Sequence, residues 1–146
     1  MKAKFIAGAA LIASLTVAGS RVPAEAQSVQ AWTVSAGLCS DWRGTWAMQH
    51  AGPGHWIGTS VLRVVGNQCT RRPIGTQITA DVDFRTFGNH TWTATTTHTD
   101  NATDCRYSGR VNANNAAAGT YSCAGQTNAR SNILITSPAA FYKMGG

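Results

Sequence analysis

The chain of 146 residues contains little charge and few of the residues that stabilise exposed helices. Charged residues make up 12% of it, against about 25% in typical soluble domains. Glu25 is the only glutamate, and the only lysines are Lys2, Lys4 and Lys143. Because Glu and Lys favour helix surfaces, this scarcity excludes a coiled coil or a large helical bundle. The 18 threonines and 15 glycines instead favour strands joined by tight turns.

Long apolar runs are absent apart from one near the N-terminus. This run, residues 5–18, follows Lys2 and Lys4 and precedes the small-x-small triplet Ala24-Glu25-Ala26. It is shorter than the roughly 20 residues of a membrane-spanning helix, so a membrane anchor is the weaker alternative. The pattern predicts a secretory signal peptide over residues 1–26. We therefore expect a secreted or periplasmic protein, with no membrane span after cleavage.

The chain also lacks a dense basic patch. Cleavage after residue 26 leaves nine basic and five acidic side chains, which lowers the net charge from +6 to +4. The arginines are scattered, and only Arg71 and Arg72 are adjacent. Proteins that follow a phosphate backbone concentrate their cations on one surface, so we expect no nucleic-acid partner.

No Cys-x-x-Cys pair occurs. The four cysteines stand at positions 39, 69, 105 and 123, all in the mature part of the chain. An even number of cysteines in an exported chain predicts two disulfides. A zinc site is the alternative, but it needs thiolates that an oxidising compartment disfavours. We expect neither a metal nor a cofactor.

The spacing of Cys105 and Cys123 favours one of the three possible disulfide connectivities. Opposed residues of an antiparallel hairpin have a constant index sum, and a sum of 228 opposes these two cysteines. The same register opposes Tyr107 to Tyr121. The sequence therefore predicts a Cys105–Cys123 disulfide, which leaves Cys39 to pair with Cys69.

Apolar and polar residues alternate along most of the mature chain, as expected for strands with one buried face. The clearest example is residues 74–85, where Asp81 and Asp83 occupy the outward face. The predicted strands cover residues 42–48, 55–65, 74–85, 90–98, 105–111, 119–123, 130–136 and 139–143. Seven or eight short antiparallel strands with turns between them predict an all-β meander, a sandwich or a barrel, over residues 41–146. Residues 27–40 are predicted to form an extended N-terminal arm.

The sequence Gly44-Thr45-Trp46 resembles the Gly-x-Trp strand that opens the barrels of calycins, the lipocalin and avidin group. The resemblance extends over residues 41–136. It implies a small up-and-down barrel of avidin size that binds something in its mouth. The polar biotin contacts of avidins and the second and third lipocalin segments have no counterpart here. The resemblance therefore implies an architecture but assigns no ligand residue.

Tryptophan is frequent, with five residues in the mature part. An indole ring offers a broad apolar face and one hydrogen-bond donor, so it suits either a core or a binding site. The side chains predicted to line the barrel mouth and bind a small apolar or aromatic molecule are Trp42, Trp46, Trp56 and Trp92. Trp32 lies outside the predicted strands and is a candidate for a lid or a partner contact.

A protein-binding module, such as an inhibitor of a secreted hydrolase, is the main alternative. Its partner, a secreted protein, would contact loops 50–55, 66–74 and 99–104. The candidate contact residues are Trp32, His55, Arg71 and Arg72. The two arginines lie beside a loop that a disulfide stabilises, and a rigid loop loses little entropy on docking.

Catalysis is the remote alternative. Asp81 and Asp83 lie about 7 Å apart along one strand face, and paired carboxylates can hydrolyse glycosides. Arg85 continues this face and would keep both ionised, whereas the reaction needs one of them protonated. No Gly-x-Ser-x-Gly nucleophile motif occurs. We therefore name no catalytic residue.

The histidines predict no metal site. His90 and His98 lie eight residues apart, about 26 Å along a strand, which is too far to bind one metal. His50 and His55 flank a tight turn and could bind a metal together with Asp41 or another carboxylate, but no third ligand lies close to them in the sequence. The sequence therefore favours an exported, non-catalytic binding protein.

Overall fold

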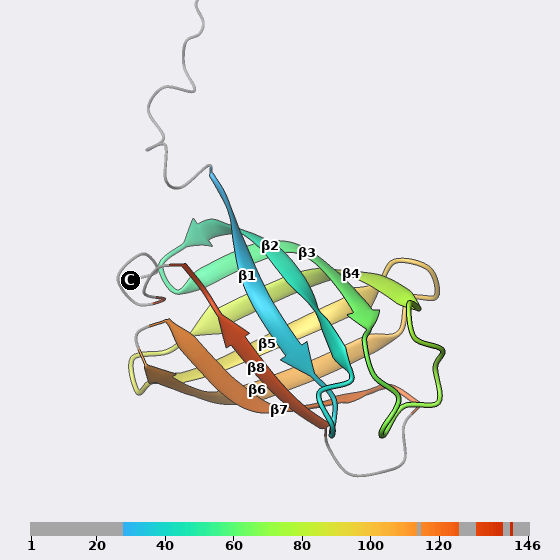
Figure 1. The fold of residues 1–146 in the computed structure, drawn as a ribbon. Helices are drawn as coiled ribbons and strands as arrows, with labels where there is room; N and C mark the ends of the chain where they lie inside the picture. The colour runs from blue at the N-terminus through green and yellow to red at the C-terminus, as the bar shows by residue number, and fades with distance from the viewer. Residues whose placement is uncertain (1–27, 114, 126–130, 139–140, 142–146) are drawn as a thin grey trace, which may run out of the picture.

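The structure is a computed structural model that describes residues 28–113, 115–125, 131–138 and 141. Eight antiparallel strands pair in sequence order and close into one barrel (Figure 1). The strands are β1 (Val29–Ala36), β2 (Trp42–Gly52), β3 (His55–Val64), β4 (Gln77–Thr86), β5 (Thr91–His98), β6 (Asp104–Ala113), β7 (Ala116–Cys123) and β8 (Ser131–Thr136). The predicted all-β antiparallel meander is confirmed. The predicted signal peptide lies outside the described residues, as does the predicted strand at 139–143 apart from Phe141.

The N-terminal segment differs from the prediction. Residues 27–40 were expected to form an arm, but β1 pairs with β2 (Trp32 opposite Trp46) and with β8 (Val34 opposite Ile135). Every second side chain of β1 from Trp32 onward is buried. Pairing with the neighbouring β2 and with β8, which is distant in sequence, supplies the stability that local sequence does not indicate. The barrel therefore begins at residue 29 and not at 41, and β1 closes it.

Because the strands alternate in direction, odd-numbered strands end at the same end of the barrel at which even-numbered strands begin. At one end, here called the mouth, the odd-numbered strands end and the even-numbered strands begin. Loops 37–41, 65–76 and 99–103 lie at the mouth. At the opposite end, here called the closed end, lie the Pro53–Gly54 turn and the β4–β5 turn at 87–90.

A cluster of aromatic rings fills the closed end. Its members are Trp32, Trp56, Phe84, Trp92 and Phe141, each at most 1% exposed. The Trp32 ring centroid lies 5.0–5.2 Å from those of Trp56, Phe84 and Phe141, in edge-to-face contacts. Trp92 stacks on Phe84 at 5.3 Å. Such contacts add to the stabilisation from burial, so this end of the barrel is core.

Two opposed glycines make room for this cluster beside the β6–β7 hairpin. Gly109 faces Gly119 in the ladder, and Trp92 of β5 is paired with Gly109. A Cβ on Gly109 would lie 2.6 Å from the Gly119 Cα, so no other residue fits without a backbone shift. The indole Nε1 of Trp92 donates a hydrogen bond to the Ala118 carbonyl at 3.2 Å. The glycines therefore allow close packing where a side chain would collide.

Both predicted disulfides are present, Cys39–Cys69 and Cys105–Cys123. The β6–β7 register opposes Cys105 to Cys123 and Tyr107 to Tyr121, as the index sum predicts. Cys39–Cys69 connects the β1–β2 loop to the β3–β4 loop. All four cysteines lie at the mouth, so the covalent links stabilise the end that the aromatic cluster does not fill.

Candidate functional site

A cavity of about 210 Å³ opens at the mouth of the barrel. Its lining residues are Ala36, Trp42, Leu62, Thr70, Arg72, Ile78, His98, Cys105, Tyr107, Tyr121 and Cys123. Larger hollows of about 430 and 440 Å³ lie on the outer wall, but they are more open to solvent. The mouth cavity is thus the better enclosed space, and its lining comes from β1 to β7 and the β3–β4 loop.

Stacked tyrosines form one wall of the cavity. The rings of Tyr107 and Tyr121 lie 4.9 Å apart with planes inclined by 25°. Trp46 packs edge-on against Tyr107 at 5.6 Å, from a position that does not line the cavity. The remaining apolar lining comes from Ala36, Trp42, Leu62 and Ile78. The cavity therefore offers flat and aliphatic apolar surfaces together.

The hydroxyls of the two tyrosines are neutral near pH 7. Burial raises the pKa of Tyr107 to about 12, against a smaller opposing effect of the hydrogen bond with Thr96. Its hydroxyl lies 3.1 Å from the Thr96 Oγ1. Burial likewise raises the pKa of Tyr121, and a hydrogen bond with Ser131 opposes the shift. A neutral phenol can donate a hydrogen bond, so both rings carry polar groups without negative charge.

His98 and the Cys105–Cys123 disulfide form the rest of the cavity lining that the strands contribute. His98 is the last residue of β5, and its Nε2 lies 4.0 Å from the Cys105 Sγ. Cys105 and Cys123 form part of the same wall. The imidazole adds two ring nitrogens, at least one of which is a donor.

The β3–β4 loop brings Thr70 and Arg72 to the cavity. Three anchors position this loop. Cys69 is disulfide-bonded to Cys39. The backbone at Val64 bonds to Gly75 and Thr76 at the base of the loop. The third anchor is the carboxylate of Asp41.

Asp41 precedes β2 and is 3% exposed. Its carboxylate accepts hydrogen bonds from the backbone N–H groups of Gln68, Cys69 and Thr70, at 3.2, 2.7 and 2.9 Å. The bond from Cys69 contributes most to lowering the pKa of Asp41, and desolvation opposes it. A Cβ on Gly66 would lie 2.8 Å from the Asp41 Oδ1, so a larger residue there would displace this carboxylate. Asp41 is therefore a structural carboxylate.

Only one of the four tryptophans predicted to bind the ligand lines the cavity. Trp42, at the start of β2, does so. Trp46 lies behind Tyr107, while Trp56 and Trp92 belong to the closed-end cluster and are buried. The alternation of strand direction is the reason, because Trp56 and Trp92 lie near the starts of odd-numbered strands. Trp46, Trp56 and Trp92 are therefore core residues, which is the other role that the sequence allowed for them.

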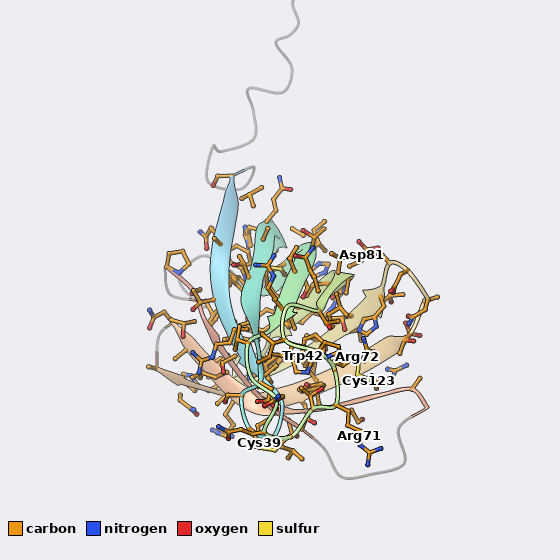
Figure 2. The ribbon with its side chains drawn as sticks, turned by 45° about the vertical axis from the view of Figure 1, so that its right-hand side comes forward. Cys39, Trp42, Arg71, Arg72, Asp81 and Cys123 are labelled. Atoms are coloured by element: carbon orange, nitrogen blue, oxygen red, sulfur yellow. A yellow bond between two sulfur atoms is a disulfide. The ribbon has the colours of Figure 1, made fainter. Side chains whose placement is uncertain are left out.

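The residues predicted for a protein partner are divided between the two barrel ends. Loop 50–55, with His55, lies at the closed end, whereas loops 66–74 and 99–104 lie at the mouth. Trp32 is fully buried within β1 and is no lid. Figure 2 shows Arg71 at the outer edge of the β3–β4 loop and Arg72 nearer to Trp42. Of the predicted partner residues, only the two arginines share one surface.

The carboxylate pair of β4 lies on the outer wall, away from the mouth. Asp83 accepts hydrogen bonds at 3.0 Å from His55 and at 3.2 Å from Arg85. Asp81 lies beside an outer-wall hollow on the same face (Figure 2). The predicted contact between Arg85 and the pair is thus found at Asp83. The arrangement is that of a solvated ion-pair surface.

The candidate metal ligands do not converge. His50 and His55 lie at the closed end, and Asp41 lies at the mouth. Within the part of the chain that the structure describes, no three His, Cys, Asp or Glu side chains are grouped as a metal site requires.

Sequence reasoning missed His98, Tyr107 and Tyr121 as cavity residues, and it assigned Arg72 to a protein partner. A usable signal was present. In a meander, the inward residues nearest the ends of odd strands and the starts of even strands all meet at one barrel end. That rule identifies Ala36, Trp42, Ile78, His98, Cys105 and Cys123, which line the cavity, together with Val64 and Ser131, which do not.

The chain matches no protein-family model, no curated protein and no solved structure. No helix among the described residues is long and apolar enough to cross a membrane. The geometry of the mouth therefore gives the best indication of function.

Proposed function

We propose that this protein is an exported, non-catalytic binding protein that holds a small molecule in the mouth cavity. The observation that carries the proposal is the partly enclosed cavity of about 210 Å³ at one end of an otherwise filled barrel, with a lining that combines apolar and aromatic side chains with a few polar ones. Small-molecule sites have this composition and occur in the mouths of β-barrels.

Two further features support this proposal. The closed eight-stranded meander is compatible with a calycin-like barrel, whose members bind ligands in the mouth, although fold analogy is a weaker argument than the site itself. All four cysteines are paired, and stable disulfides are typical of secreted or periplasmic proteins.

Docking of a secreted protein at the mouth loops is the second candidate. The β3–β4 loop is anchored by Cys39–Cys69 and exposes Arg71 and Ile74, the latter 63% exposed. A pre-ordered loop with an exposed apolar side chain suits a protein contact. This function would use the outer surface of the loop and leave the cavity empty.

A cavity-filling variant distinguishes these functions. Ala36 lines the cavity and is 2% exposed, so Ala36→Phe places a ring in that space. One- and two-ring aromatic compounds, both neutral and charged, would be tested by saturation-transfer NMR. We expect members of the set to bind the wild type and to lose binding in Ala36→Phe.

The neighbouring Ser35 provides a matched control, since Ser35→Phe adds the same ring on the outer wall and should leave binding intact. Thermal unfolding of both variants checks that they fold. The proposal fails if no compound binds the wild type, or if Ala36→Phe binds as the wild type does.

A further inference from the structure

We infer that the ligand of the mouth cavity is a small aromatic carboxylate, with its anionic group at Arg72 and its ring against the tyrosine pair. This inference rests on the proposed function and specifies the chemical class of the ligand.

The charge of the cavity lining is the first argument. Arg72 is its only formally charged residue, and no carboxylate is among the lining residues. Among the described residues, the Arg72 guanidinium has no hydrogen-bond or ion-pair partner; its backbone N–H alone bonds, to the Thr70 Oγ1 at 3.2 Å. A guanidinium presents its donors in a fork that matches a carboxylate. An uncompensated arginine at a cavity therefore selects an anion.

The carboxylates near the mouth are already engaged or lie away from the lining. Asp41 accepts three backbone hydrogen bonds. Asp104 accepts a hydrogen bond from the Thr97 Oγ1 at 2.8 Å on the outer face. Asp100 is exposed in the β5–β6 loop. None of the three lines the cavity, so none competes there for Arg72.

Further arginines stand at the same end of the barrel. Arg43 of β2 lies directly opposite Arg63 of β3, an arrangement of like charges that is unfavourable by itself. Arg63 donates a hydrogen bond to the Gln77 Oε1 at 2.6 Å. With Arg71 and Arg72, these side chains produce a positive field on one side of the mouth, which raises the rate at which an anion arrives.

The anchored loop fixes where the anion can bind. Arg72 lies three residues beyond the disulfide-bonded Cys69 and two beyond Thr70, whose N–H bonds to Asp41. In Figure 2, Arg72 lies beside Trp42 and Cys123, whereas Arg71 extends away from them. A loop that is ordered before binding loses little entropy when a ligand arrives.

The size and the walls of the cavity indicate the rest of the ligand. The cavity volume of about 210 Å³ lies below the range of about 300–1,000 Å³ that is usual for drug-sized ligands. Tyr107 is 8% exposed, whereas Arg72 is exposed at the rim. A flat ring can therefore pack inward on the tyrosine pair while its carboxylate stays at the rim.

The test compares 2-naphthoate with 2-naphthamide, which has nearly the same shape and no charge, by titration calorimetry on the full chain with its disulfides intact. We expect the carboxylate to bind about 10- to 100-fold more tightly, the usual effect of a hydrogen bond to a charged group. Arg72→Gln should remove most of that preference, because it weakens binding of the carboxylate much more than binding of the amide. Arg71→Gln, one residue away and outside the lining, should retain it.

Each outcome decides the inference. Equal affinities for the two compounds, or a preference that persists in Arg72→Gln, would overturn the ligand class while the proposed function stands. If both Arg71→Gln and Arg72→Gln lose the preference for the carboxylate, the preference comes from the general positive field of the mouth, and the specific role of Arg72 is wrong. Failure of both compounds to bind would also overturn the ligand class. In that case, the proposed function is tested separately by the NMR experiment with the wider set of aromatic compounds and the Ala36→Phe variant.

Discussion

At the scale of single residues, Asp41 shows how one side chain determines the geometry of a site that it does not line. Its carboxylate binds three consecutive N–H groups of the β3–β4 loop, and its own carbonyl accepts a hydrogen bond from Val65 at 2.7 Å. Thr70 and Arg72 reach the cavity on this loop. The sequence presents Asp41 only as an isolated carboxylate, because its partners are backbone groups 27–29 residues away.

Asp41 makes the stability of the protein depend on pH in acid. Its pKa is lowered in the folded state from the ordinary value of 3.8, so the unfolded chain binds the proton more readily. The stabilisation is complete above that value and is lost as the pH falls through the folded-state pKa. We expect Asp41→Asn to lower the urea midpoint near pH 6 and to reduce its fall between pH 6 and pH 2.

The exposed Asp100 is the matched control. Urea midpoints measured from pH 2 to pH 6 should be nearly the same for Asp100→Asn and the wild type. An Asp41→Asn protein that retained the full acid dependence of the wild type would contradict this role.

At the scale of structural elements, the barrel divides into a packed end and an open end. Phe141, which follows β8, covers the packed end and contacts Trp32 and Phe84 at 5.0 and 5.4 Å. The mouth lacks such a plug and is linked by two disulfides instead. Stability and binding are therefore separated along the barrel axis.

This separation predicts the effect of Phe141→Ala. Removing a fully buried phenylalanine costs about 3–5 kcal/mol, which chemical denaturation can measure. Phe87→Ala, at a site 45% exposed, should lower the free energy of unfolding by only about 1 kcal/mol, because about half of the side chain is already in water. Below the unfolding transition, Phe141→Ala should still bind ligand with wild-type affinity. Loss of binding in a folded Phe141→Ala protein would show that the two ends are coupled.

At the scale of the whole molecule, local patterns predicted most of the barrel. Alternation predicted the strands from residue 42 onward, and the index sum predicted the register of the β6–β7 hairpin and its disulfide. The first strand was not predicted, since β1 forms by pairing with β2 and β8, and β8 lies about 100 residues away. Closure of a barrel is a property of the complete chain.

The candidate site was predicted less well than the fold. Trp42 and Arg72 were singled out, but Trp42 was grouped with three core tryptophans and Arg72 with a protein-binding surface. Tryptophans on inward strand faces look alike in sequence whichever end of the barrel they occupy. Once β1 is included, the alternation of strand direction places Trp42 at the mouth and Trp56 and Trp92 at the closed end.

Binding of ligands at the mouth can be followed through the indole N–H resonances in the ¹H–¹⁵N spectrum of the protein during titration with 2-naphthoate. Each resonance can be assigned with single Trp→Phe variants. We predict that the Trp42 signal shifts with saturation, while those of Trp32, Trp56 and Trp92 in the closed-end cluster stay in place. Saturable shifts confined to the closed-end signals, with the Trp42 signal unmoved, would show that the ligand does not bind at the mouth.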